Sequence, residues 1–157
     1  MPVIIALGSN RRHGRHGAPR AVLRAAMHAL EDDGIRIIGR SPIIETAPLG
    51  PSRRRYANAV VSVDTHLSPA ALLVRLQAIE TRFGRKRQRR WGARVLDLDL
   101  IAYDGEVRRT ERLELPHPEM TRRAFVLGPM LAVAPDWRHP RLNLTVRQMF
   151  ARLTRRR

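Results

Sequence analysis

Two acidic residues at positions 97 and 99 have the type and spacing to do chemistry. Asp97 and Asp99 alternate with Leu96, Leu98 and Leu100, and successive side chains of a strand point to opposite faces. An extended chain would therefore put both carboxylates on one face and the leucines on the other. Carboxylate oxygens suit Mg²⁺ that carries a substrate's phosphates. The alternative is a strand edge with two solvated acids that neutralise nearby arginines.

Concentrated positive charge precedes the acidic pair. Trp91-Gly92 interrupts a run of cations that consists of Arg85, Lys86, Arg87, Arg89, Arg90 and Arg94. Guanidinium groups bind phosphate oxygens in a bidentate manner. Glycine near both ends of this run and its dense like charge favour a loop, and such a loop could close over a bound triphosphate.

Composition limits the possible classes of protein. The 157 residues are enough for one domain with a real core, so we expect a single domain over 1–157. The chain has no cysteine, which excludes disulfides, thiolate zinc sites and thiol nucleophiles. The short apolar start at 1–7 runs into Gly8-Ser9-Asn10 and indicates a strand and a turn rather than a signal peptide. No segment is long enough to span a membrane, so we expect a cytoplasmic protein with no membrane partner.

The net charge favours polyanionic partners without choosing among them. Thirty Lys and Arg residues against 14 Asp and Glu give +16, and the resulting field attracts nucleic acid, membrane phosphates or nucleotides. Arginine makes up nearly all of the positive charge, which can also reflect a GC-rich genome. The arginines of the 155–157 tail therefore need no ligand.

The first half of the chain alternates strands with helices. Val3 to Leu7 predicts a buried strand, and apolar residues at helical spacing predict a helix from Pro19 to Gly34. Residues 35–46 predict a second strand that Pro42 kinks or confines to an edge, and Tyr56 to Val63 alternates as a third. Ser68-Pro69 starts a second helix that ends at Gly84.

The second half adds the acidic strand and further elements. Asp104-Gly105 predicts a tight hairpin into another short strand. Helices are expected at about 121–132 and 146–153, the last with a Thr145/Gln148 capping box. The order predicts an α+β fold, namely a ferredoxin-like βαββαβ core with an antiparallel sheet, helices on both faces and an added C-terminal hairpin and helices.

Several motifs along the chain, taken together, resemble the 6-hydroxymethyl-7,8-dihydropterin pyrophosphokinases of folate biosynthesis. They are Gly8-Ser9-Asn10, residues 46–51, Tyr56-x-Asn58, the Arg90-to-Asp99 segment, and Pro116-His117-Pro118-x-Met120 with Arg123-x-Phe125. The resemblance covers nearly the whole chain, and the segment from Arg90 to Asp99 is its most specific unit.

The resemblance implies an ATP-dependent pyrophosphokinase that transfers the β,γ-pyrophosphoryl group of ATP to the pterin's hydroxymethyl oxygen and releases AMP. It implies two Mg²⁺ held by Asp97 and Asp99, with ATP as co-substrate, and catalysis by positioning and electrostatics. Asp97, Asp99, Arg94 and Arg85 are the implied catalytic residues.

The resemblance also assigns binding residues. The nucleotide side comprises Gln77, Glu80, Arg87, Trp91, Arg94, Leu100, Arg112, His117 and Arg123. The pterin side comprises Thr46, Pro48, Leu49, Tyr56, Asn58, Trp91 and Phe125. Arg94 and Arg123 are the strongest candidates for phosphate contact. On their residue types alone, Asn58 could instead satisfy buried backbone, Tyr56 and Phe125 could be core aromatics, His117 could be a residue of a rigid turn, and Glu80 could be a solvated rim residue.

Two other classes of protein compete with the enzyme. An RNA-binding module could combine a ferredoxin-like sheet with high positive charge, but the third and fourth strands carry Asn58, Asp97 and Asp99 where stacking aromatics would be needed. A ribosome-associated protein with a dead ancestral site is disfavoured because the acids and key arginines remain. We therefore expect small-molecule substrates, only non-specific nucleic-acid binding through net charge, and a monomer.

Overall fold

An antiparallel sheet forms the centre of the protein. In the computed structural model, which describes residues 2–11, 13–46, 56–84 and 95–155, the strands are β1 (Val3–Ser9), β2 (Arg36–Arg40), β3 (Ile44–Thr46), β4 (Tyr56–Asp64) and β5 (Asp97–Tyr103). Their order is β2-β4-β1-β5, with β3 paired to β4. Helix α1 (Pro19–Asp32) follows β1 and helix α2 (Pro69–Arg82) follows β4. The predicted α+β class with an antiparallel sheet is confirmed.

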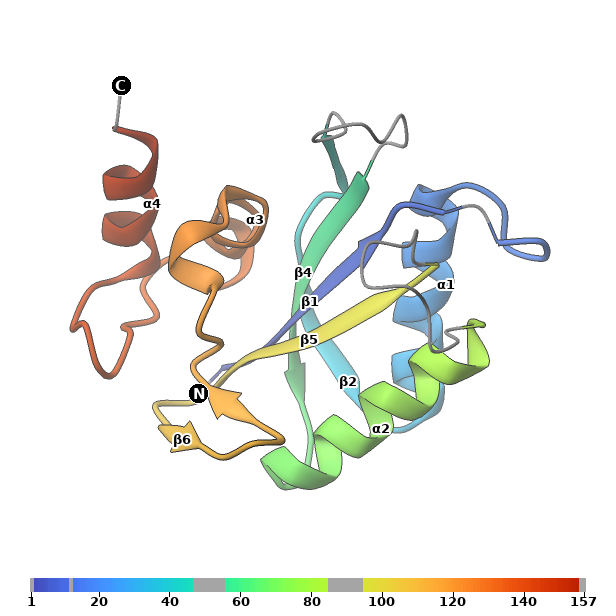
Figure 1. The fold of residues 1–157 in the computed structure, drawn as a ribbon, viewed down its shortest axis with the longest axis horizontal. Helices are drawn as coiled ribbons and strands as arrows, with labels where there is room; N and C mark the ends of the chain where they lie inside the picture. Colours follow the sequence, from blue (N-terminus) through green and yellow to red (C-terminus); the bar gives the residue numbers. More distant parts are fainter. Residues whose placement is uncertain (1, 12, 47–55, 85–94, 156–157) are drawn as a thin grey trace.

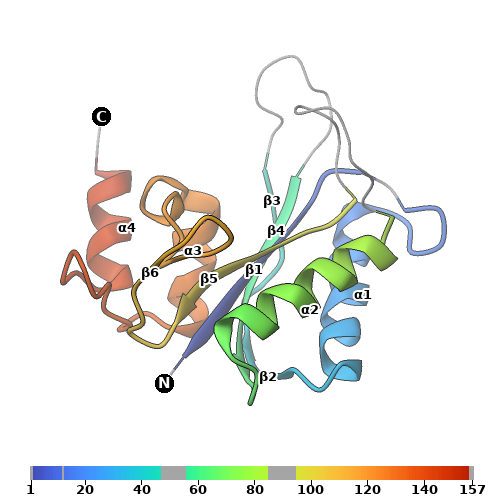
Figure 2. The same ribbon diagram turned by 60° about the horizontal axis from the view of Figure 1, so that its bottom comes forward.

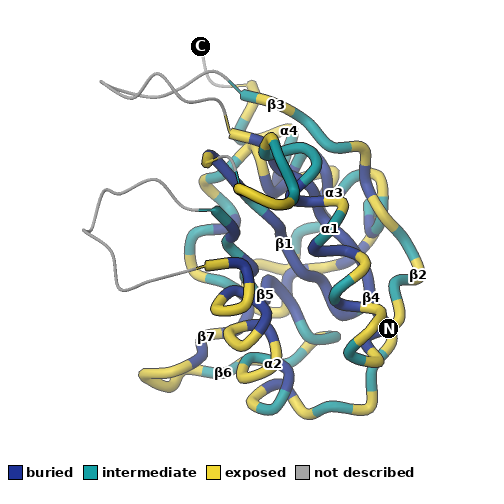
Figure 3. The backbone as a smooth tube through the Cα atoms, turned by 90° about the vertical axis from the view of Figure 1, so that its right-hand side faces the viewer, coloured by how far each residue is buried: buried dark blue, intermediate teal, exposed yellow. Residues whose placement is uncertain are grey.

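Helices cover both faces of this sheet, as predicted. Helices α1 and α2 pack on one face, and α3 (Ala124–Val133) with α4 (Val146–Thr154) lies on the other (Figures 1 and 2). Each face has its own apolar core, one beneath α1 and α2 and one beneath α3 and α4. Strand β4 is consequently buried at every position from Ala57 to Val63, and Figure 3 shows the exposed residues gathered on the outer elements. Successive side chains of β4 point to opposite faces, as the alternation predicts, but both faces are covered, so the side chains on either face are buried.

Local sequence signals account for most of the element ends. The Ser68 hydroxyl accepts the Ala71 backbone N–H at 3.2 Å at the start of α2, and Thr145 and Gln148 form both bonds of a capping box on α4. Pro42 lies between β2 and β3, because a residue without an N–H interrupts the predicted strand. These predictions are confirmed.

The expected hairpin after β5 is only partly correct. Asp104 turns the chain with a φ of 53°, but the next strand, β6 (Arg108–Arg109), pairs with β7 (Glu114–Leu115) and not with β5. The turn is held from outside the hairpin, since the Asp104 N–H donates to the Pro2 carbonyl at 2.8 Å and the Trp137 indole N–H donates to the Asp104 carbonyl at 2.9 Å. Within the turn, the Glu106 N–H donates to the Tyr103 carbonyl at 3.0 Å.

The helix expected over 121–132 is divided in two. A 3₁₀ turn, η1, covers Met120–Arg122 and α3 begins at Ala124. Arg123 between them is extended, with φ −115° and ψ 102°, so the periodicity of the apolar residues continues across a break in the helix. In the described part of the chain, no helix is both long and apolar enough to cross a membrane.

Candidate active site

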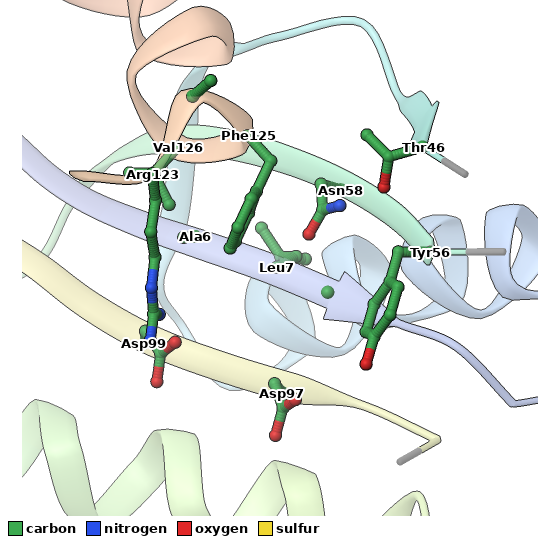
Figure 4. A pocket seen from close by; sticks show the side chains of 12 residues that line it. Ala6, Leu7, Thr46, Tyr56, Asn58, Asp97, Asp99, Arg123, Phe125 and Val126 are labelled. Atoms are coloured by element: carbon green, nitrogen blue, oxygen red, sulfur yellow. The ribbon is translucent and has the colours of Figure 1, made fainter. Parts of the chain in front are cut away.

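The acidic pair lies on the sheet face that is turned toward α3. Asp97 and Asp99 project from β5 half-buried, while Leu96, Leu98 and Leu100 are buried in the core on the α2 side. The alternation predicted from the sequence is confirmed. The two carboxylates therefore share one side of an edge strand, where a ligand can reach both (Figure 4).

A cavity of about 460 Å³ opens above this pair. Four strands and the start of α3 line it, through Ala6, Leu7, Gly8, Thr46, Tyr56, Asn58, Asp97, Asp99, Arg123, Ala124, Phe125 and Val126. Residues predicted for the pterin side (Thr46, Tyr56, Asn58, Phe125) thus share one cavity with the predicted acids and Arg123. Its volume lies within the range of small-molecule sites.

Two aromatic rings flank the open part of the cavity. Tyr56 is 37% exposed and Phe125 is 36% exposed, and both side chains reach into the space above β1 (Figure 4). Such rings have free surface to stack on a flat heterocycle. Asn58, only 6% exposed, lies between them on β4 with its amide turned toward the same space.

Gly8 is a lining residue that we did not predict as part of the site. It pairs with Asn58 across β1 and β4 and with Asp97 across β1 and β5. A Cβ atom here would lie 3.2 Å from the Asn58 Oδ1. The Gly8-Ser9-Asn10 motif was the available signal, because a glycine at the end of a buried strand often marks a close approach. Ala6, Leu7, Ala124 and Val126, which carry no polar group, gave no such signal.

Asp99 and Arg123 line the other end of the cavity, and both act on the charge of His117, which does not line it. The Arg123 side chain runs toward Asp99 (Figure 4). Burial lowers the pKa of His117; Asp99 opposes this shift, and Arg123 adds to it. The His117 Nδ1 accepts the Glu119 N–H at 3.1 Å, so the neutral ring carries its proton on Nε2 and can donate from there.

The remaining predicted nucleotide residues lie elsewhere. Gln77 and Arg112 line a second groove of about 730 Å³ between α2 and the β6–β7 segment, which shares no lining residue with the cavity. Leu100 is buried in the core at 3% exposure. Glu80 is 4% exposed, so it is no solvated rim residue.

The other predicted site residues fall outside the described part of the chain. They are Pro48, Leu49, Arg85, Arg87, Trp91 and Arg94. The sheet ends that flank their segments, at Thr46, Tyr56 and Asp97, all border the cavity.

The donor set suits a cation that arrives with phosphates. Within the described residues, no group of three or more His, Cys, Asp or Glu side chains could hold a metal ion by itself. Mg²⁺ usually keeps several waters and binds one or two carboxylates plus substrate phosphates rather than an all-protein cage. Asp97 and Asp99 fit that pattern.

The RNA-binding alternative finds no support in the arrangement of the layers. An RNA recognition motif offers one open sheet face with aromatic side chains for base stacking. Here α1 and α2 pack on one face, and α3, with α4 packed against its outer side, lies on the other. Among the described residues, the cavity on that second face is lined by the two acids, which repel a phosphate backbone.

Comparisons with known proteins agree with this geometry. The sequence model of the family described as 7,8-dihydro-6-hydroxymethylpterin-pyrophosphokinase (HPPK) matches residues 4–135. The 2-amino-4-hydroxy-6-hydroxymethyldihydropteridine pyrophosphokinase of Pseudomonas aeruginosa is 43% identical over 140 residues, which cover 88% of this chain and 83% of the relative. The enzyme of the same name from Haemophilus influenzae is 42% identical over 134 residues, with 84% and 81% covered.

Solved structures show the same fold at low identity. A Plasmodium falciparum HPPK-DHPS crystal structure with pteroate has a TM-score of 0.74 and 14% identity, and the match covers 96% of this chain and 42% of that longer chain. At such identity the likeness concerns the fold alone, whereas the sequence matches define the family. The chain therefore belongs to the 7,8-dihydro-6-hydroxymethylpterin-pyrophosphokinase family and is an ATP-dependent pyrophosphokinase of folate biosynthesis.

Proposed function

We propose that the cavity binds 6-hydroxymethyl-7,8-dihydropterin with its hydroxymethyl group directed at Asp97 and Asp99. The hydroxymethyl oxygen forms a bond to the β-phosphorus of ATP, and the bond from that phosphorus to the α,β-bridging oxygen breaks. AMP leaves with the bridging oxygen, and the hydroxyl proton is released. The observation that carries the proposal is the convergence of Tyr56, Asn58 and Phe125 with the two acids around one space of about 460 Å³.

In this proposal the acid pair binds metal ions, and the cationic side chains bind the phosphates of ATP. We propose that Asp97 and Asp99 hold two Mg²⁺, which when bound neutralise triphosphate charge and orient the reacting oxygens. Arg123 binds a phosphate oxygen with its guanidinium, and His117 donates from Nε2 to another. Arg85 and Arg94 add phosphate contacts, and Arg87 and Trp91 help to hold the nucleotide. Positioning supplies most of the rate, as in phosphoryl transfer generally.

The pterin is held by stacking and by edge recognition. Phe125 and Tyr56 offer ring faces, and the Asn58 amide can both donate to and accept from the edge of a heterocycle. Thr46, with Pro48, Leu49 and Trp91, completes this side. Gln77 and Arg112 bind the nucleoside from the groove beside α2.

The proposal extends to the cellular setting. We propose that a monomer that forms one domain carries out the reaction in the cytoplasm. Nucleic acid binds only through net charge, and moderate salt abolishes that binding.

The test is AMP release from ATP and Mg²⁺ with and without the pterin. Pterin-dependent AMP is expected, whereas ADP or pterin-independent product would contradict the reaction. Asp97→Asn and Asp99→Asn should each abolish turnover at saturating Mg²⁺ with the fold retained. Asp64→Asn is the matched control, since Asp64 ends β4 in an exposed ion pair with Arg36. Near-normal turnover in either site variant would refute the metal assignment.

A further inference from the structure

Glu80 is a buried carboxylate of α2 that contacts the backbone of β5. It lies in the last part of α2, 4% exposed, and its Oε2 accepts the backbone N–H of Leu98 at 2.7 Å. Leu98 is the residue between Asp97 and Asp99. Glu80 therefore contacts the backbone from which both acids project, on the α2 side of the sheet.

The position of β5 in the sheet gives this bond its importance. Strand β5 is at an edge and pairs only with β1 among the described strands. On its outer side the Ile101 carbonyl accepts the His117 N–H at 2.8 Å, but no described strand pairs there, and an edge strand without a second partner strand can shift or fray. The Glu80 carboxylate supplies an acceptor at the point where the acids must keep their spacing.

Burial of a carboxylate is costly unless strong hydrogen bonds compensate it. The bond to Leu98 is short and charge-assisted, the type that fixes geometry best. The neighbours of Glu80 on α2 that pack into the core, Leu76 and Ile79, are fully buried and fix the helix against the sheet. The Glu80 carboxylate thus projects from a helix that is fixed in place by core packing.

We infer that Glu80 is a positioning residue: it holds the β5 backbone at Leu98 and thereby sets the spacing and direction of Asp97 and Asp99, and it does not bind ATP directly. The inference rests on the proposed function for its kinetic consequence only. The hydrogen bond and its effect on β5 can be tested in the protein without substrate or metal.

The first measurement is amide hydrogen exchange of ¹⁵N-labelled protein without ligands. The Leu98 amide should be protected in the wild type and in Glu80→Gln, which keeps an acceptor oxygen. In Glu80→Ala its exchange should be faster by roughly 10- to 100-fold, as expected for local opening. The Ile5 amide in β1 should be unaffected. Unchanged protection of Leu98 in Glu80→Ala would overturn the inference whatever the enzyme's activity.

The second measurement separates positioning from nucleotide binding. Glu80→Ala should lower kcat by about 100-fold, because small displacements of catalytic groups cost that much, with KM for ATP within about twofold. Glu80→Gln should restore most of kcat. A selective rise in KM for ATP with normal kcat would instead make Glu80 a nucleotide contact.

A second substitution and a control complete the design. If Glu80→Ala does not fold, Glu80→Asp retains the charge but withdraws the acceptor by one methylene, and it should show the same loss of protection and of kcat. Thr81→Ala, the next residue on α2, is exposed and should behave as wild type in both assays. Wild-type AMP release tests the proposed function independently, so its failure and the failure of this inference are distinct results.

Discussion

The Arg123 guanidinium carbon lies 5.7 Å from the centroid of the Phe125 ring. A guanidinium within about 6 Å of a ring face is attracted by the ring's quadrupole. The contact joins the proposed phosphate-binding cation to the proposed pterin-stacking ring, and both come from the start of α3. Binding of both substrates should therefore be measured for a substitution in either residue.

Phe125→Leu should weaken pterin binding selectively. Leucine keeps apolar surface but loses the stacking contribution of the ring, about 1 kcal/mol or roughly fivefold in affinity. Calorimetric titration with pterin should show this loss, and titration with ATP should change by less than about twofold. Equal losses for both ligands would contradict the division of the site.

Arg123→Ala should lower kcat by roughly 30- to 150-fold, since a hydrogen bond to a charged group contributes about 2 to 3 kcal/mol. Arg122→Ala is the matched control. Arg122 is the preceding residue, but its side chain is 72% exposed in an ion pair with Glu119, so its removal should leave kcat within about twofold. Similar losses in the two variants would mean that net charge, and not the place of Arg123, matters.

Gly8→Ala should reduce pterin affinity by roughly tenfold. The added Cβ would lie 3.2 Å from the Asn58 Oδ1, so the Asn58 side chain must shift, and overpacking of this kind costs about 1 to 3 kcal/mol. Gly14→Ala is the control, because a Cβ there meets nothing within 4 Å. Unaltered pterin binding in Gly8→Ala would show that Asn58 can move without loss.

His139 should make the protein less stable in acid. It is 7% exposed, and its Nδ1 accepts the N–H groups of Arg141 and Leu142, each at 3.2 Å. Burial lowers the pKa of His139 in the folded protein below the ordinary 6.5. As the pH falls, the unfolded chain therefore binds the proton before the folded protein does. The free energy of unfolding consequently decreases once the pH drops below about 6.5, the ordinary pKa of histidine.

The comparison is between wild type and His139→Gln in urea. The stability advantage of the wild type should be complete above about pH 7 and should shrink as the pH falls through the lowered pKa of His139. An advantage that stays constant from about pH 7.5 to pH 5 would contradict the role of neutral His139.

Short-range patterns in the sequence determined the elements and the direction of the key side chains. Alternation alone placed Asp97 and Asp99 opposite their leucine neighbours, as the structure has them. Ser68 and the Thr145/Gln148 pair marked helix starts correctly. These rules hold because each depends on backbone geometry within a few residues.

Only the tertiary structure decided which distant segments meet. Leu98 and Glu80 are 18 residues apart and are joined through α2 packing on β5, and the break at Arg123 that starts α3 interrupts a continuous apolar pattern. Likewise, β6 pairs with β7 and not with β5, and Pro2 and Trp137, far away in the sequence, bond to the Asp104 turn. Such contacts depend on the order of strands and the layering of helices, for which the periodicity of one segment carries no information.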